Sequence, residues 1–376
     1  MDRFYTKYIV EDLSKKMVFM GGPRQVGKTT LSKFIGSKHF SSMEYLSWDL
    51  DEHRQAILKK QWPKDCPFII FDELHKYPRW KQWIKGVYDT KPLDQQYMVT
   101  GSARLDVYRR GGDSLMGRYH YWRLHPLTID ELPPEISLEE GYERLLRLGG
   151  FPEPFLENDA REAKRWRKER FDRVIREDIR DTESIRQLEI LALFVEALRT
   201  RVGGLITLSN WAQDLQIAPT TAKAWLSLIE KMYIGFVVYP YTKNLPRAIQ
   251  KPPKFFFYDN ADVIDDGGAR LENFVATTLI KRLHFREDYH GDVCSLHYIR
   301  DKEKREVDFL TVVNGEIEDL IEVKSSDTTV STALKYYTEK LKPKRAVQLV
   351  GDLKRGFDKD NIQVRHPIEF FKDPIW

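Results

Sequence analysis

The sequence predicts an α/β protein in which a parallel sheet is followed by a charged helical stretch and a second α/β region. Between residues 16 and 132, short apolar runs alternate with amphipathic stretches, which is typical of strand–helix units around a parallel sheet. From residue 137 to residue 200 the pattern becomes helical and heavily charged. Farther along, residues 306–313 and 318–323 have the pattern of two strands joined at Asn314-Gly315, a strong hairpin signal.

Length and composition narrow the class of protein. A chain of 376 residues favours two or three domains, and a hydrophobic content of 41% excludes wholesale disorder. No apolar run approaches the roughly 20 residues that span a bilayer, and the charged N-terminus lacks the apolar core of an export signal. The two cysteines, Cys66 and Cys294, exclude a disulfide framework or a four-cysteine zinc site. We therefore expect a cytoplasmic protein with no membrane partner, whose net charge of +4 permits nucleic acid without requiring it.

A phosphate-binding motif follows the first predicted strand, at residues 17–20, and precedes a helix predicted from Thr29 to Ile35. The motif fits G-x-x-x-x-G-K-[ST] and consists of Gly22, Pro23, Arg24, Gln25, Val26, Gly27, Lys28 and Thr29, with Thr30 next. Its backbone amides face phosphate oxygens, Lys28 neutralises the β and γ phosphates, and Thr29 ligates Mg²⁺. We therefore expect ATP and Mg²⁺ as cofactors; the alternative is a glycine-rich turn without a ligand.

Two further strands end in polar residues that suit hydrolysis of a bound nucleotide. The strand at 68–71 delivers Asp72 and Glu73 at its carboxyl end, where ligands of open α/β sheets lie. In this Walker B pattern, Asp72 would hold the Mg²⁺ shell and Glu73 would polarise the attacking water. The strand at 96–100 ends in Thr100 and Ser102, whose hydroxyls could orient that water or the γ phosphate, although Thr-Gly-Ser is also a common turn.

Five segments together resemble the prokaryotic AAA+ ATPase family that carries a C-terminal DUF4143 region: GPRQVGKTT (22–30), FDELH (71–75), TGS (100–102), SLMGRY (114–119) and GGFPEP (149–154). The resemblance implies a P-loop AAA+ parallel-sheet domain with a helical lid. It also implies that Arg118 completes the site of a neighbouring subunit, in a homo-oligomer that could be a hexamer. Pro152 would lie against adenine. The alternative for Arg118 is a surface arginine that satisfies a carbonyl, and the alternative for Pro152 is a helix-breaking turn.

The helical middle has the outline of a winged helix-turn-helix. Residues 208–215 and a helix from Thr220 flank a tight turn, and a strand-like run at 235–239 follows. Such a second helix enters the major groove of DNA, which would bring Thr220, Thr221 and Lys223 to the bases or phosphates. Residues 241–253 have the composition of a linker or an exposed basic wing. Basic side chains among and beside them are Lys243, Arg247, Lys251 and Lys254. The alternative is that this segment serves as a lid or contacts another protein.

Carboxylates and a lysine gather near the C-terminus. Side chains two apart on a strand share a face, so Glu322 and Lys324 point the same way, and Asp308 can reach them across the hairpin. With Glu272 from the preceding predicted helix, at 271–283, such a set suits a Mg²⁺-dependent phosphodiesterase. The pattern is similar to the PD-(D/E)xK nuclease superfamily. Many domains of this fold serve instead as DNA-binding platforms, so cleavage stays open.

The expected organisation is an AAA+ ATPase domain at 1–135, a helical lid at 136–200, a winged helix at 201–260 and a C-terminal α/β restriction-endonuclease-like domain at 261–376. The function expected first is a Mg²⁺-dependent ATPase that binds or remodels DNA, including branched DNA such as Holliday junctions. The alternatives are a STAND-like regulatory switch with a non-catalytic nuclease-like domain and an ATP-gated defence nuclease.

Overall fold

The computed structural model describes residues 2–101, 115–175, 185–242, 251–264 and 268–373. The chain folds into two compact units, Met1–His125 and Pro126–Trp376, and each is considered by itself. Across these described ranges, no helix combines the length and the apolar character needed to cross a membrane.

The first unit contains a five-stranded parallel sheet in the order β2-β3-β4-β1-β5. Its strands are β1 (Met17–Gly21), β2 (Met43–Ser47), β3 (Phe68–Asp72), β4 (Gln96–Thr100) and β5 (Tyr119–Arg123). Its helices are α1 (Thr6–Leu13), α2 (Lys28–His39), α3 (Asp51–Lys59), the short η1 (Leu74–Lys76) and α4 (Trp80–Asp89). The predicted strands at 17–20, 68–71 and 96–100 are confirmed, and the order places β4 between β1 and β3.

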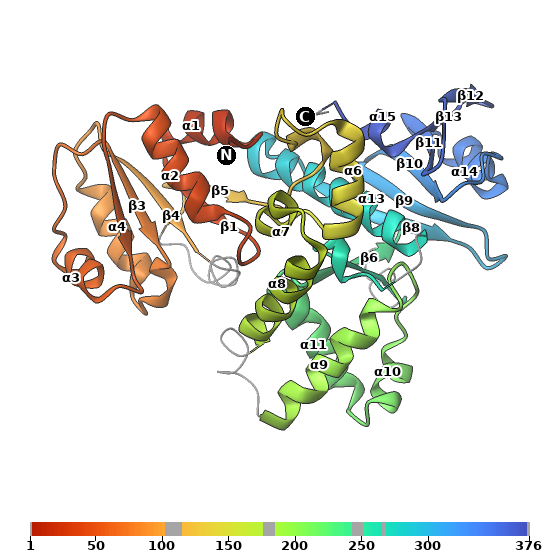
Figure 1. Cartoon of the computed structure of the whole chain (residues 1–376), viewed down its shortest axis with the longest axis horizontal. Helices are drawn as coiled ribbons and strands as arrows, with labels where there is room; N and C mark the ends of the chain where they lie inside the picture. The colour runs from red at the N-terminus through yellow and green to blue at the C-terminus, as the bar shows by residue number, and fades with distance from the viewer. Residues whose placement is uncertain (1, 102–114, 176–184, 243–250, 265–267, 374–376) are drawn as a thin grey trace. The chain divides into compact units, whose positions relative to one another are not determined.

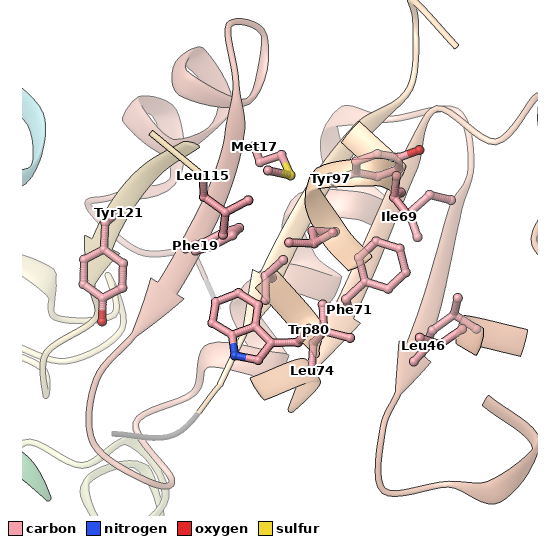
Figure 2. Close-up of a cluster of buried hydrophobic side chains, with 14 of the residues drawn as sticks. Met17, Phe19, Leu46, Ile69, Phe71, Leu74, Trp80, Tyr97, Leu115 and Tyr121 are labelled. Atoms are coloured by element: carbon pink, nitrogen blue, oxygen red, sulfur yellow. The ribbon is translucent and has the colours of Figure 1, made fainter. Parts of the chain in front are cut away.

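Alternate residues of each strand point to opposite sides of the sheet, and helices cover both faces. The cluster in Figure 2 contains Met17 and Phe19 of β1 and Ile69 and Phe71 of β3, all buried, with Trp80 of α4 packed among them. Helices α1 and α2 contact the opposite face, and Figure 1 shows α2 and α4 on either side of the sheet. Burial on both faces fixes the strand register, so the carboxyl ends of β1, β3 and β4 lie at one edge.

The second unit begins with helices. They are η2 (Ile129–Glu131), α6 (Leu138–Leu148), α7 (Pro152–Glu157), α8 (Ala160–Arg173), α9 (Ile185–Arg199), α10 (Leu208–Asp214) and α11 (Pro219–Lys231). The helical character predicted for 137–200 is thus confirmed where the structure describes it. Helices α10 and α11 pack on each other, and Trp211, Trp225 and Ile229 contribute buried side chains to them.

An eight-stranded mixed sheet follows, in the order β12-β13-β11-β10-β9-β8-β6-β7. Its strands are β6 (Gly235–Pro240), β7 (Lys254–Phe257), β8 (Cys294–Arg300), β9 (Glu306–Val313), β10 (Glu316–Lys324), β11 (Arg345–Val350), β12 (Phe357–Lys359) and β13 (Ile362–Arg365). The remaining helices are η4 (Asn260–Asp262), α13 (Gly268–Phe285), the π-helical turn η5 (Arg286–His290), α14 (Thr332–Leu341) and α15 (Pro367–Phe371). Helices α13 and α14 cover opposite faces of this sheet (Figure 1).

The predicted hairpin at Asn314-Gly315 is confirmed. Asn314 and Gly315 have φ of 51° and 85°, and such positive φ at both central residues matches the twist of the two strands. Strands β9 and β10 pair antiparallel on either side of this turn. A register shift between Ile317 and Leu320 then moves the pairing by one residue, so that Phe309 pairs with Ile321 and Asp308 comes opposite Glu322 near the end of β10.

Candidate nucleotide site and the carboxylate cluster

The loop between β1 and α2 has the conformation that a phosphate-binding loop needs. Gly22, Gln25 and Gly27 have φ of 130°, 63° and 96°, so the chain turns sharply before α2 begins at Lys28. A Cβ on Gly22 would lie 2.3 Å from the Leu124 carbonyl oxygen, so only glycine fits there. Amides of this loop and of the first turn of α2 can thereby converge on an anion.

Lys28 closes the loop from its concave side. Its side chain is buried, and its ammonium donates to the carbonyl oxygens of Gly22 at 3.0 Å and Pro23 at 2.6 Å. Of the other predicted loop residues, Val26 and Pro23 are buried, Arg24 is half-buried, and Gln25 and Thr30 are exposed. The lysine therefore lies at the loop where the β and γ phosphates of a nucleotide are expected.

Asp72, at the end of β3, accepts hydrogen bonds from three hydroxyl groups. Thr29 and Tyr45 donate to Oδ2 at 2.9 and 2.6 Å, and Thr100 donates to Oδ1 at 2.5 Å. Burial, followed by the hydrogen bond to Asp72, raises the pKa of Tyr45. The structure thus brings together Thr29, Asp72 and Thr100, which the sequence had placed at the start of a helix and at two strand ends.

Tyr45 was not predicted for this site. It lies in β2, which the hydrophobic pattern did not reveal, and it reaches Asp72 because β2 pairs with β3. Alternation along β2 was the available signal: Tyr45 and Ser47 share one face of the strand, and Ser47 pairs with Asp72 in the register.

Glu73 follows Asp72 in a left-handed conformation, with φ of 54°. Its amide donates to the Thr100 carbonyl at 2.9 Å, while its carboxylate oxygen Oε2 lies 3.4 Å from Lys76 Nζ and 3.7 Å from His75 Nε2. Lys76 is held in turn by Asp49 at 2.6 Å. Burial raises the pKa of Glu73, which moves the carboxylate toward the range of a general base.

Arg118 precedes β5 and lies at the opposite edge of the sheet from the phosphate loop. Tyr119 pairs with Met17, the first residue of β1, and Gly21 lies four residues farther along that strand, about 13 Å away. Its guanidinium donates to both carboxylate oxygens of Asp89, at 2.7 and 3.2 Å. Arg118 therefore does not belong to the phosphate site of its own chain.

Two other predicted residues, Ser102 and Pro152, are not placed at this site. Ser102 lies outside the described residues. Pro152 opens α7 in the second unit, and its contact with adenine stays a prediction.

The second constellation centres on a lysine that the sequence placed elsewhere. Lys254 was assigned to a linker or an exposed basic wing; this assignment is wrong, because Lys254 is the buried first residue of β7. Its ammonium lies 2.7 Å from Glu306 Oε1, 3.1 Å from Glu272 Oε1 and 3.5 Å from Asp308 Oδ1. Glu306 was not singled out either. We call these four residues the Lys254 cluster.

The predicted residues Glu322 and Lys324 adjoin the Lys254 cluster. Lys324 Nζ pairs with Glu322 Oε1 at 2.7 Å, and the amide of Val323 donates to Asp308 Oδ2 at 2.8 Å. Burial, and next the charge of Asp308, raise the pKa of Glu322 to about 7; the same two causes raise the pKa of Glu272 to about 7. All four predicted side chains are thus brought to one end of the β9–β10 hairpin.

These residues were tested for fit to a divalent metal ion. Within the described ranges, no group of three or more His, Cys, Asp or Glu side chains is arranged to hold a metal ion. In the Lys254 cluster, an ammonium lies among the carboxylates that would be the ligands. The residues present therefore do not fit the metal that a nuclease of this superfamily would use.

The predicted DNA contacts lie on and after α11. Thr220 and Lys223 are exposed and Thr221 is half-buried, near the N-terminus of the helix. Lys243 and Arg247 lie outside the described residues. Strands β6 and β7 pair antiparallel, and Leu205, between α9 and α10, bridges to Lys254 of β7.

A glycine-rich loop between a strand and a helix, with an acidic strand end two strands away, defines a P-loop nucleotide-binding α/β domain. Comparison with protein families agrees. Residues 14–133 match the model of an AAA domain. Residues 139–261 match domain of unknown function DUF8612, and residues 267–369 match domain of unknown function DUF4143. The models of an AAA domain and of DUF4143 thus match the two regions in which the motifs predicted them.

Two uncharacterized proteins are similar to this chain over most of its length. An uncharacterized protein of Mycobacterium tuberculosis is 23% identical over 313 residues, which cover 80% of this chain and 68% of that protein. One from Methanocaldococcus jannaschii is 23% identical over 97% of this chain and 88% of its own length.

Among solved structures, the RuvB Holliday junction branch migration motor of Thermotoga maritima aligns with 63% of this chain and 87% of its own, at 18% identity and a TM-score of 0.33. A STAND protein with a tetratricopeptide repeat sensor, from Pyrococcus horikoshii, aligns with 77% of this chain and 48% of its own, at 12% identity and a TM-score of 0.25. At such scores the two likenesses carry no argument.

Proposed function

We propose that this chain is a Mg²⁺-dependent ATPase that couples ATP hydrolysis to the binding or remodelling of DNA. The observation that carries the proposal is the junction at Asp72, where Thr29 of the phosphate loop and Thr100 of the intervening strand meet the Walker B carboxylate at 2.9 and 2.5 Å. A glycine-rich turn that binds no ligand would not need a carboxylate held in place beside it by these hydroxyl groups.

Each residue at this edge of the sheet has a role that its surroundings support. Lys28 would exchange its bonds to the loop carbonyls for the β and γ phosphates, which are stronger, charged acceptors. Thr29 and Asp72 would hold Mg²⁺, which when bound neutralises charge on the transferring phosphoryl group. Glu73 would accept the proton of the attacking water, and Thr100 would orient that water or the γ phosphate.

Arg118 suits a site in another copy of the chain. Because it lies at the far edge of its own sheet, it can reach a γ phosphate only when a second copy presents its phosphate loop. Its double hydrogen bond with Asp89 would then orient the guanidinium for that purpose. We therefore propose a homo-oligomer, with hexamers among the assemblies to be tested.

The part of the proposal that concerns DNA is supported by α9, α10, α11 and the β6–β7 pair. Three helices followed by two antiparallel strands, with the Leu205 bridge as a third short strand, follow the order of a winged helix-turn-helix. The exposed start of α11 carries Thr220 and Lys223, with no acidic residue in the first turn. This end of the helix would face DNA phosphates.

The first experiment measures nucleotide affinity and ATP turnover. Lys28→Ala should abolish binding, whereas Lys38→Ala, an exposed lysine on the same helix, should leave it unchanged. Glu73→Gln should bind ATP normally and lower turnover by about 10²-fold or more, the contribution of a general base. Full ATP affinity in Lys28→Ala would refute the nucleotide site, and unchanged turnover in Glu73→Gln would remove Glu73 from the chemistry.

The second experiment adds DNA, both linear duplexes and four-way junctions, at several salt concentrations. We expect DNA to raise turnover, and its affinity to fall steeply with salt because phosphate contacts release counterions. Lys223→Glu should weaken binding, while Lys231→Glu, at the other end of α11, should have a smaller effect. ATP turnover without any response to DNA would leave the ATPase standing and would favour a nucleotide-governed regulatory switch.

A further inference from the structure

The Lys254 cluster holds a positive charge of its own. An ammonium has three hydrogen-bond donors, and Lys254 lies within 3.5 Å of three carboxylates, from Glu272, Glu306 and Asp308. The lysine side chain is only 3% exposed, so water does not replace these contacts. Burial of an ammonium is costly unless opposite charges surround it, and here they do.

The second oxygens of two of these carboxylates, which do not face the ammonium, are engaged as well. Asp308 Oδ2 accepts the Val323 amide, and Glu306 Oε2 accepts from Arg300 at 2.8 Å. Mg²⁺ needs about six oxygen ligands at roughly 2.1 Å in octahedral geometry. A divalent ion could take the oxygens that face the ammonium only by displacing Lys254, whose backbone is fixed in β7 by its pairing with Val238 of β6.

Several chain segments meet at this cluster, and a cation that belongs to the chain can hold them together. Lys254 begins β7, Glu272 lies on α13, and Glu306 and Asp308 lie on β9. A Cβ on Gly203 would come within 2.4 Å of Glu272 Oε2, so the segment before α10 also packs closely on it. One ammonium thereby connects the β6–β7 pair to the hairpin and to α13.

We propose that Lys254 takes the place of a divalent metal ion in this domain, so that the cluster fixes the fold around an internal ammonium and does not support metal-dependent cleavage of DNA. The nearby Glu322 Oε2 is buried and has no hydrogen-bond partner among the described residues. This oxygen does not make the cluster a metal site. With Lys324 bound to its other oxygen, Glu322 already has a positive neighbour. The proposal concerns a site apart from the nucleotide loop and stands or falls independently of it.

The test measures binding of Mn²⁺ alone to the full chain, by the loss of the free-ion electron paramagnetic resonance signal. Six proteins are compared: wild type, Lys254→Ala, Lys254→Arg, Asp308→Asn, Lys254→Ala with Asp308→Asn, and Lys251→Ala. Lys251 is an exposed lysine three residues upstream and serves as the matched control. Because the nucleotide site is the same in all six proteins, any Mn²⁺ that it binds cancels in the comparison.

We expect Lys254→Ala to gain one Mn²⁺ per chain, at least tenfold tighter than any Asp308-dependent binding in wild type, and the double variant to lose it. Lys254→Arg and Lys251→Ala should match wild type. Wild-type Mn²⁺ binding that Asp308→Asn abolishes would overturn the proposal, and so would wild-type nicking of plasmid DNA that depends on Asp308. Should Lys254→Ala fail to fold, these two wild-type measurements, with Asp308→Asn as their control, still decide.

Discussion

Replacing Tyr45 with phenylalanine tests whether the Asp72 junction is held by charge-assisted hydrogen bonds. The substitution removes one oxygen, whose bond to Asp72 Oδ2 is 2.6 Å long. Hydrogen bonds to charged groups contribute about 1.5–3 kcal/mol to stability, and those to neutral groups about 0.5–1.5 kcal/mol. Since Tyr45 is half-buried, we expect Tyr45→Phe to lower the free energy of unfolding by about 1.5–2 kcal/mol.

Tyr97→Phe is the matched control on β4. Its hydroxyl also donates over 2.6 Å, but to the neutral amide oxygen of Gln95. Both acceptors keep a second donor after the change, Thr29 for Asp72 and Trp62 for Gln95, so neither is left without a partner. The control should therefore lose only about 1 kcal/mol.

Urea denaturation of the full chain, without nucleotide, measures both losses. The Asp72→Asn background completes a double-mutant cycle: there, Tyr45→Phe should lose about 1 kcal/mol less than in wild type, because the acceptor is no longer charged. Equal losses for Tyr45→Phe and Tyr97→Phe, together with no coupling to Asp72, would refute the assignment of a charged acceptor at the strand end.

Two further predictions concern the loop and the helical segment. Gly22→Ala should destabilise the chain by about 2–4 kcal/mol in urea denaturation, because its Cβ would lie 2.3 Å from the Leu124 carbonyl oxygen. The control Gly117→Ala, also at positive φ but with nothing within 4 Å of its Cβ, should cost about 1 kcal/mol. Similar losses in the two variants would contradict the close approach at Gly22. Burial raises the pKa of Glu230 to about 7, so the folded chain keeps its proton while the unfolded chain releases it, and wild type loses stability as the pH rises from about 4.5 to 7. Glu230→Gln, which keeps an acceptor for the Val237 amide, should match wild type near pH 4 and exceed it by of order 1–3 kcal/mol at pH 8; a constant difference across that range would refute the raised pKa.

Local signals explain what could be predicted in the first unit. Strands β1, β3 and β4 each contain a short apolar run, and the residues that end or follow each strand lie at the same edge of a parallel sheet. That rule alone was enough to place Lys28, Asp72 and Thr100 near one another. Strands β2 and β5 mix polar and aromatic residues and gave no such signal, and for that reason Tyr45 was missed.

The carboxylate cluster was predicted only in part, for a different reason. Hairpin geometry is local, so the turn at Asn314-Gly315 was enough to bring Asp308 to the end of β10. The register shift between Ile317 and Leu320, which sets the partner of Asp308, was not predicted. The partners of Lys254 lie 18 to 54 residues away along the chain, beyond any periodic pattern. Its position among prolines suggested a linker, although the three phenylalanines that follow it were the sign of a buried strand.

The two sites differ in how their charges are compensated, and this difference gives them opposite tendencies toward a divalent cation. Asp72 receives three hydroxyl donors, which orient its carboxylate but leave its negative charge in place. In the C-terminal set, Glu272, Glu306, Asp308 and Glu322 supply four negative charges, and Lys254, Arg300 and Lys324 supply three positive ones, leaving a formal charge of −1. With the pKa values of Glu272 and Glu322 both raised to about 7, part of that remaining charge is lost at neutral pH. A cation such as Mg²⁺ would therefore be drawn to the carboxylate at the nucleotide loop, which neutral hydroxyl groups hold in place. At the other site it would meet two ammonium groups and little net attraction.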